Sequence, residues 1–266
     1  MKKLTAAVAF VAAMALPFTA SAHRAWIAPT ATVLSGDDAW VGFDAGMSNG
    51  VFIADHAAMN LAGLVITAPD GSPVTAEHIN RSQYRSTFDL HLTQQGTYRV
   101  ANLSGGIGGS YMFNGERQRF RATTADYASE IPAGATDVQV SRSAGRTETF
   151  VTLGEPSTGA LAATGVGIEL VPVSHPNDLV AGKAATFKMV HNGQPAAGLD
   201  VTIARGGSRY RNAPEEVTVR TGADGSFTVT WPTAGMYWMN ASIRTEASGD
   251  QLAYSAAYNG IVELLP

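Results

Sequence analysis

The chemistry that this sequence offers is mainly that of histidine, because the chain has six histidines and no cysteine. His23 follows the triplet Ala20-Ser21-Ala22, a small-residue signal of the kind that signal peptidase cleaves. Cleavage after Ala22 would give His23 a free α-amine, which together with the imidazole Nδ1 can close a chelate ring around a metal. The amine has a reference pKa of ~8, so a divalent metal displaces its proton at neutral pH. His23 is therefore a candidate metal ligand; the alternative is a histidine that follows the cleavage site without a role.

Two further histidines, each close to an aspartate, are candidates to complete a site with the N-terminal histidine. His91 and Asp89 share the polar face of an alternating segment, 86–92, and His56 follows Asp55 in the chain. A metal-bound imidazole usually donates its second N–H to a carboxylate, so the two aspartates are expected to support these histidines from outside the ligand set. Nitrogen ligands favour copper or nickel, and zinc is compatible with them. The alternative for each histidine is a solvent-facing residue on a strand or loop.

The first 22 residues have the pattern of a cleaved signal peptide. Lys2 and Lys3 form a positive start, and an apolar run of about 15 residues, 4–18, leads to the cleavage triplet. That run is shorter than the ~20 residues that a membrane-spanning helix needs, and no later apolar run matches it. We therefore expect residues 1–22 to be removed and the mature chain to be a soluble periplasmic protein. The alternative is an uncleaved N-terminal anchor.

The charge and the motifs of the chain argue against several classes of function. The formal net charge is −4 and the predicted signal peptide holds two of the lysines, so the acidic mature chain has no electrostatic reason to bind nucleic acid. The chain has no P-loop and no H-E-x-x-H zinc motif. Without cysteine it also has no thiol nucleophile. We therefore expect a protein that is not an enzyme.

Strand and turn signals run through the whole chain and predict an all-β fold. Short runs of β-preferring residues such as 86–92 alternate between apolar and polar positions, and Asn192-Gly193 and Asp224-Gly225 are typical of hairpin turns. Strands at this spacing are typical of β-sandwiches. We expect two β-sandwich domains, residues 23–160 and residues 161–266, the second immunoglobulin-like, with the boundary in a stretch rich in serine, threonine, glycine and alanine.

Four segments carry further sequence signals. Residues 147–153 form a predicted strand that either completes the first sheet or bridges to the second. Residues 123–130 are predicted to form a short amphipathic connecting helix. The glycine-rich stretch 104–110 is expected to be a flexible loop rather than a phosphate cradle, because no helix follows it. Three arginines alternate along 116–121 and either bind an anion or form a solvated strand face.

Several motifs occur in a set order along the mature chain. They are His23-x-x-Trp26, Pro69-Asp70-Gly71, Gly96-Thr97-Tyr98, Glu169-Leu170-Val171-Pro172, the stretch 193–198, Asp224-Gly225-x-Phe227 and Gly235-Met236-Tyr237-Trp238. In this order they resemble the DUF4198 family over essentially the whole mature chain. The resemblance implies a periplasmic protein similar to periplasmic components of nickel and cobalt uptake systems, acting near an inner-membrane transporter or a TonB-dependent receptor. Of the family's features, the N-terminal histidine alone transfers to a residue here, His23.

These observations lead to three hypotheses. The main one is a periplasmic transition-metal-binding protein that serves metal uptake or homeostasis and holds copper or nickel, or zinc, through His23 with His91 and His56. The alternative is a non-catalytic β-sandwich interaction or scaffold module that partners a membrane transporter, receptor or reductase, since fold does not choose between the two. The third is a copper oxidative enzyme with a histidine brace, for which the sequence identifies no substrate-binding face. Stoichiometric metal binding would separate the first hypothesis from the second.

Overall fold

The computed structural model describes residues 23–213 and 215–266, and it confirms the all-β class. The predicted signal peptide, residues 1–22, lies outside the described residues. The described part of the chain contains no α-helix; its helical segments are three short 3-10 helices, η1 (Tyr127–Glu130), η2 (Gly159–Leu161) and η3 (Ser208–Tyr210). None of these segments has the length or the apolar character of a membrane-spanning helix.

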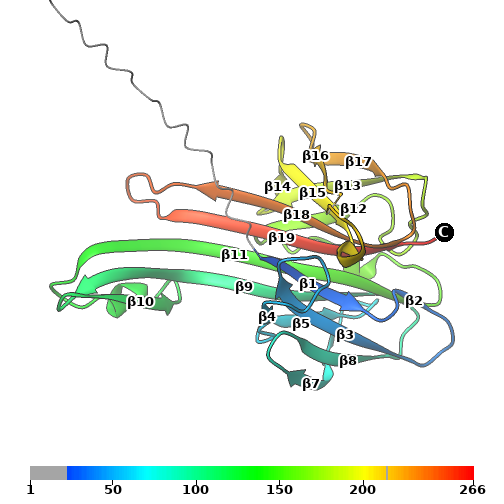
Figure 1. Cartoon of the computed structure of the whole chain (residues 1–266), viewed down its shortest axis with the longest axis horizontal. Coiled ribbons are helices and arrows are strands. Elements are labelled where there is room, and N and C mark those ends of the chain that lie inside the picture. The colour runs from blue at the N-terminus through cyan, green and yellow to red at the C-terminus, as the bar shows by residue number, and fades with distance from the viewer. Residues whose placement is uncertain (1–22, 214) are drawn as a thin grey trace, which may run out of the picture.

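The strands form three sheets (Figure 1). The five-stranded sheet has the order β1 (Arg24–Pro29), β3 (Ala39–Ser48), β8 (Ser86–Leu92) and β7 (Glu77–Arg81), with β4 (Ala57–Ala58) beside β3. The ten-stranded sheet has the order β16 (Val217–Arg220), β15 (Asp200–Arg205), β18 (Gly235–Thr245), β19 (Ala253–Leu264), β11 (Thr136–Leu153), β9 (Gly96–Phe113), β5 (Leu64–Thr67) and β6 (Pro73–Val74), with β10 (Glu116–Ala122) beside β9 and β2 (Val33–Leu34) beside β11. The four-stranded sheet contains β12 (Ile168–Pro172), β13 (Ala184–His191), β14 (Gln194–Pro195) and β17 (Ser226–Thr230).

The first sandwich packs the five-stranded sheet against β5, β9 and β11 of the large sheet. The alternation predicted for residues 86–92 is confirmed, because Phe88, Leu90 and Leu92 of β8 are buried while the residues between them are half-buried. Phe43 of β3 stacks on Phe88 across the strand pair, with ring centroids 4.7 Å apart. Period-two alternation therefore places one face of β8 in the core and leaves the other face for polar side chains.

The second sandwich packs the four-stranded sheet against β15, β18 and β19 of the large sheet. Phe187 and Met189 of β13 face Met239 and Tyr258 from the large sheet, and all four are fully buried. The predicted immunoglobulin-like sandwich is confirmed for this half of the chain. The hairpin expected at Asn192-Gly193 is confirmed, because this turn joins the paired strands β13 and β14. The turn at Asp224-Gly225 instead connects β16 to β17, which belong to different sheets and form no hairpin.

Both sandwiches contain a tyrosine corner, a tyrosine near the start of a core strand that bonds to backbone just upstream. In the first, the Tyr98 hydroxyl donates to the carbonyl of Gln94 at 3.2 Å and accepts from its N–H at 2.7 Å. In the second, the Tyr237 hydroxyl donates to the carbonyl of Thr233 at 2.8 Å. A glycine with φ above +120° lies two residues before each tyrosine, at Gly96 and Gly235. The repeated Gly-x-Tyr motif thus forms the same structure at the start of β9 and of β18.

Strand β11 contains residues 147–153, for which the sequence left two possibilities: completing the first sheet or bridging to the second. It pairs antiparallel with β9 from Thr136 to Leu153 and parallel with β19 from Ser141 to Thr149. It therefore completes the first sheet and also bridges to the second. As a result one continuous sheet runs through both sandwiches, past the expected division at 160/161.

A small apolar cluster joins the two sandwiches a second time. It contains Trp26 of β1 and Trp238 of β18, which pack with Val51 and Ile261. The indole N–H of Trp238 donates to the carbonyl of Ala25 at 2.9 Å. The start of the N-terminal strand is therefore anchored on the second sandwich as well as on its own sheet.

Four charged side chains are buried where the sandwiches meet: Arg99, Arg146, Glu148 and Glu169, each 5% exposed or less. The Arg146 guanidinium lies 3.2 Å from the Glu148 carboxylate and 3.0 Å from that of Glu169. Glu169 also accepts two backbone N–H bonds, at 2.8 and 2.7 Å, from the segment that precedes β12. Because buried charges are tolerated only when paired, this network fixes the crossing of the chain between the sandwiches.

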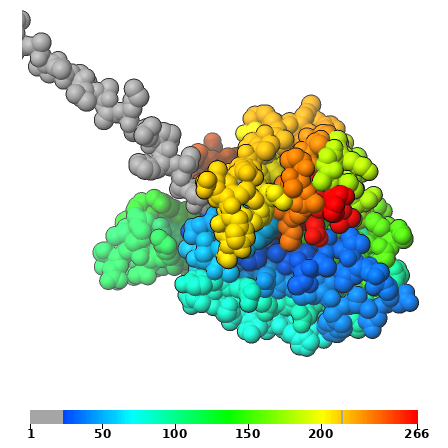
Figure 2. All heavy atoms as spheres, turned by 45° about the vertical axis from the view of Figure 1, so that its right-hand side comes forward, coloured from blue at the N-terminus to red at the C-terminus, as the bar shows by residue number. Residues whose placement is uncertain are grey.

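Strands β9, β10 and β11 extend beyond the sandwiches as an arm, the green projection in Figures 1 and 2. Two expectations for this region were wrong. Residues 104–110 form part of strand β9 rather than a flexible loop, because β11 pairs with all of them and β10 pairs with residues 107–110 on the other side. In place of a helix over 123–130 there is a turn followed by η1, which buries no residue and so has no apolar face to stabilise a longer helix.

Candidate metal centre

His23 and His56 lie together at one end of the five-stranded sheet. His23 precedes β1 and His56 precedes β4, and both strands pair with the same end of β3. There β1 begins opposite Ser48, and Ala57 lies opposite Met47. The two imidazole rings are stacked, with centroids 3.4 Å apart and planes 7° from parallel. Residues 33 positions apart in sequence are thus neighbours, because β3 lies between the strands that follow them.

These two histidines present nitrogen donors on the surface. Both side chains are exposed, so a metal ion could reach them without opening the core. A coordinated metal lies in the plane of the imidazole ring at about 2.0–2.1 Å from the nitrogen, so the stacked rings would have to turn toward each other to share one ion. If the chain is cut after Ala22, the amine of His23 adds a third nitrogen. The donor set fits a metal that accepts neutral nitrogen ligands.

His91 does not join this pair. It lies opposite Trp40 at the other end of β3, whereas β1 begins opposite Ser48, so about 26 Å of strand separates the two ends. The His91 Nε2 contacts the carboxylate of Asp38, and its ring stacks on the indole of Trp40 with centroids 4.4 Å apart. The expected three-histidine arrangement is therefore not formed.

The two aspartates also have roles other than the expected ones. Asp89 faces His78 of β7, whose Nδ1 lies 2.9 Å from its carboxylate, instead of supporting His91. Asp55 accepts the backbone N–H of Asn49 at 2.9 Å. Asp55 thus ties the segment that carries His56 to the end of β3, so it helps to position His56 through the backbone.

Sequence reasoning missed a cluster around Trp40, which is 48% exposed. His78 lies in β7, with a positive φ of 50° where the register with β8 shifts. Its ring lies 6.0 Å from that of Trp40, on which His91 also stacks. The sequence signal that could have found the cluster is the alternation that puts Trp40 and His91 on one face, but their pairing depends on the register of β3 and β8.

The charge beside His23 is compensated. The Arg24 guanidinium contacts the carboxylate of Glu216 and lies 5.0 Å from the centre of the Trp238 ring. An uncompensated arginine next to the ligands would oppose the binding of a cation. The pairing with Glu216 reduces that opposition, and it also holds the start of β1 against the second sandwich.

Within residues 23–213 and 215–266, no group of three or more histidine, aspartate or glutamate side chains is arranged to hold a metal ion. The candidate site at the start of β1 therefore has two imidazoles and, if the chain is cut after Ala22, one amine. Its completeness depends on the new N-terminus.

The comparisons with known proteins give a family but no characterised relative. The model of the family described as "Domain of unknown function (DUF4198)" matches residues 20–245. No curated protein matches the chain. Among solved structures, the chain is similar to the D0-D1 domain of Intimin, with 13% identity, 90% of this chain and 97% of that chain covered, and a TM-score of 0.23. It is also similar to a DUF4785 family protein from Legionella pneumophila, with 9% identity, 90% and 55% covered, and a TM-score of 0.25. At these TM-scores neither likeness carries an argument.

Proposed function

The chain belongs to the DUF4198 family, and we propose that it is a periplasmic protein that binds one transition-metal ion through His23 and His56. The ligands are the imidazoles of both residues and the amine that cleavage after Ala22 creates. The observation that carries the proposal is the stacking of the two rings with centroids 3.4 Å apart. Two scarce residues of the same metal-binding type, both exposed, meet at the predicted new N-terminus.

The donor set favours copper or nickel over other divalent metals. With no cysteine in the chain, the soft thiolate ligands that select zinc or Cu(I) are absent. Neutral nitrogen donors bind Cu(II) most strongly among the first-row divalent ions, and Ni(II) and Zn(II) follow. Zinc is therefore also compatible with the site, but it should bind more weakly than copper.

An exposed three-nitrogen site suits a metal carrier. Its open coordination positions can accept a ligand from a second protein, so the ion can pass on without leaving protein ligands. This is compatible with metal uptake or homeostasis, with an inner-membrane transporter or a TonB-dependent receptor as the partner. A closed four-ligand site would instead favour a structural metal.

Calorimetry tests the chelate directly. The chain that begins at His23 should bind one equivalent of Cu(II) or Ni(II) tightly. A chain with the same residues but an acetylated His23 amine offers no amine ligand, so its affinity should fall by about a hundredfold or more. Equal affinities for the two chains would show that the amine is not a ligand and would refute the proposal.

A further inference from the structure

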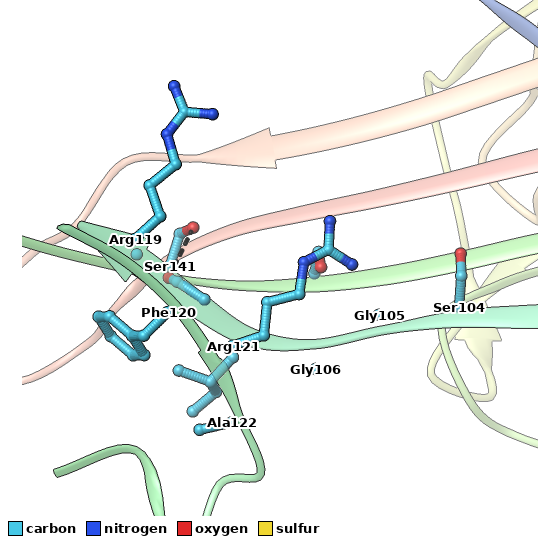
Figure 3. A pocket seen from close by; sticks show the side chains of 12 residues that line it. Ser104, Gly105, Gly106, Arg119, Phe120, Arg121, Ala122 and Ser141 are labelled. Atoms are coloured by element: carbon cyan, nitrogen blue, oxygen red, sulfur yellow. Dashed lines mark hydrogen bonds between the residues drawn. The ribbon is translucent and has the colours of Figure 1, made fainter. Parts of the chain in front are cut away.

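The arm carries a hollow that is separate from the proposed metal site. One face of the arm has a hollow of about 660 Å³ where β10, β9 and β11 lie side by side (Figure 3). We call it the arm trough. The residues that define it are Arg119 and Arg121 of β10, Gly106 and Gly108 of β9, and Ser141 and Ser143 of β11.

The strand register explains the shape of the trough. Arg121 lies opposite Gly108, which in turn lies opposite Ser141, so an arginine, a glycine and a serine form one row across the sheet. Figure 3 shows the Arg119 and Arg121 side chains rising on the same side of the sheet. Since glycine has no side chain, the middle strand leaves an open floor between a wall of arginines and a wall of hydroxyls.

The trough is positively charged although the chain is acidic. No aspartate or glutamate lines it, and the guanidinium groups of Arg119 and Arg121 make no ion pair or hydrogen bond with any residue that the structure describes. Arg117, the next arginine of the stripe, differs, because it contacts the Asp137 carboxylate and donates to the Ser110 hydroxyl at 2.9 Å. Two guanidiniums of the stripe are therefore left to face the hollow.

We propose that the arm trough binds a small diffusible anion that carries two carboxylate or phosphate groups. A guanidinium grips such groups with two parallel hydrogen bonds. Residues i and i+2 of a strand are about 7 Å apart, so Arg119 and Arg121 can each hold one group of the same ligand. The hydroxyls of Ser141 and Ser143 can donate from the opposite wall, while the glycine floor lets the ligand lie against the backbone.

The size of the positive region favours a small ligand over a membrane surface or a long polyanion. Glu246 lines the neighbouring hollow on the far side of Arg119, and Asp137 neutralises Arg117 at the tip. Acidic groups therefore bound the positive region. A membrane surface or a polymer would need a broader run of unpaired cations.

Titration with pyrophosphate and with succinate, which carry two phosphate and two carboxylate groups, followed by calorimetry on the metal-free mature chain, tests the proposal. At least one of these probes should bind with one-to-one stoichiometry, and the affinity should fall as salt is raised. Arg119→Gln and Arg121→Gln should each weaken binding about tenfold. Arg117→Gln changes the net charge equally but should leave the affinity unchanged.

A fourth variant tests the glycine floor without changing the charge. Gly108 does not have a positive φ, and an added Cβ would lie 3.3 Å from the Phe120 carbonyl oxygen, so Gly108→Val should fold and fill the trough. It should weaken binding as strongly as the loss of an arginine. The proposal is overturned if neither probe binds, or if Arg117→Gln weakens binding as much as Arg121→Gln. It is also overturned if the protein binds phosphatidylglycerol vesicles through Arg119 and Arg121 but binds neither probe. Because metal is absent, none of these results bears on His23.

Discussion

The imidazole rings of His23 and His56 lie with their centroids 3.4 Å apart and their planes 7° from parallel. Each histidine directly precedes a strand that pairs with the end of β3, so the sheet itself brings the two rings together. The strand after His23 is held by the second sandwich through Trp238 and by its own sheet. The fold thus fixes the backbone positions of both histidines, whereas their exposed rings can turn.

Histidine substitutions should separate the site from the rest of the sheet. His56→Ala should weaken Cu(II) or Ni(II) binding by more than the roughly 10–100-fold that loss of a supporting outer group costs, because it removes a ligand. His91→Ala is the matched control and should leave affinity unchanged, since His91 lies at the other end of β3. Calorimetry of the two variants checks this. A greater loss in His91→Ala than in His56→Ala would place the metal elsewhere.

Glu169→Gln should destabilise the protein. The variant removes the charge that faces Arg146 at 3.0 Å in a site where both side chains are buried. Loss of one partner from a buried ion pair costs about 3 kcal/mol. Here Arg99 and Arg146 would be left with the single carboxylate of Glu148, so one buried positive charge would lack compensation. Urea unfolding at pH 7 measures the change. Glu155→Gln, at an exposed position, serves as the control and should shift stability by less than about 0.5 kcal/mol.

The same carboxylate predicts a pH dependence of stability. Burial on its own would raise the pKa of Glu169, but hydrogen bonds from Thr164 and Gly165 and the charge of Arg146 outweigh it and hold the pKa below the ordinary value of 4.5. A group whose pKa is lowered by folding stabilises the protein above its unfolded pKa. That contribution is lost as the pH falls from 4.5 through the folded pKa.

Unfolding experiments on both forms at a series of pH values check this dependence. The difference in free energy of unfolding between the wild type and Glu169→Gln should be constant from pH 7 to pH 5 and should shrink below pH 4.5. A difference that grows on acidification would show that the folded pKa is raised instead.

The two tyrosine corners should differ in strength. The Tyr98 hydroxyl bonds to the N–H groups of Thr93 and Gln94 and to a carbonyl, whereas that of Tyr237 bonds to one carbonyl. Tyr98→Phe leaves more backbone groups unpaired and should cost about 1–3 kcal/mol. Tyr237→Phe should cost less, at about 1 kcal/mol. Thermal unfolding of both variants tests the order, and equal losses would contradict the hydrogen-bond explanation.

Local patterns predicted the parts of the fold that depend on neighbours in sequence. The alternation in β8 and the Asn192-Gly193 turn are properties of a few adjacent residues, and the structure has both. The parallel pairing of β11 with β19 could not be read in this way, because it joins strands about 110 residues apart. The strand over 104–110 was missed for a similar reason: glycine disfavours strands locally, and partners on both sides overcome that preference.

The residue types of the candidate site were predictable from the sequence, but which histidines come together was not. The position of His23 after a small-residue triplet is visible in the sequence, and so is the shared face of His91 and Asp89. Which histidine meets His23 depends on which end of β3 each strand pairs with. That register is set by packing across the whole sheet. It brings His56 to His23 and takes His91 to Trp40.

The central claim is that the chain starts at His23 and holds one metal there with His56. Native mass spectrometry of the protein expressed with residues 1–22 and recovered from the periplasm, after addition of one equivalent of Cu(II), tests both parts in one spectrum. The expected result is a single species with the mass of residues 23–266 plus one copper ion, and loss of the copper in His56→Ala but not in His91→Ala. A chain that starts at another residue, or one that retains no copper, would contradict it.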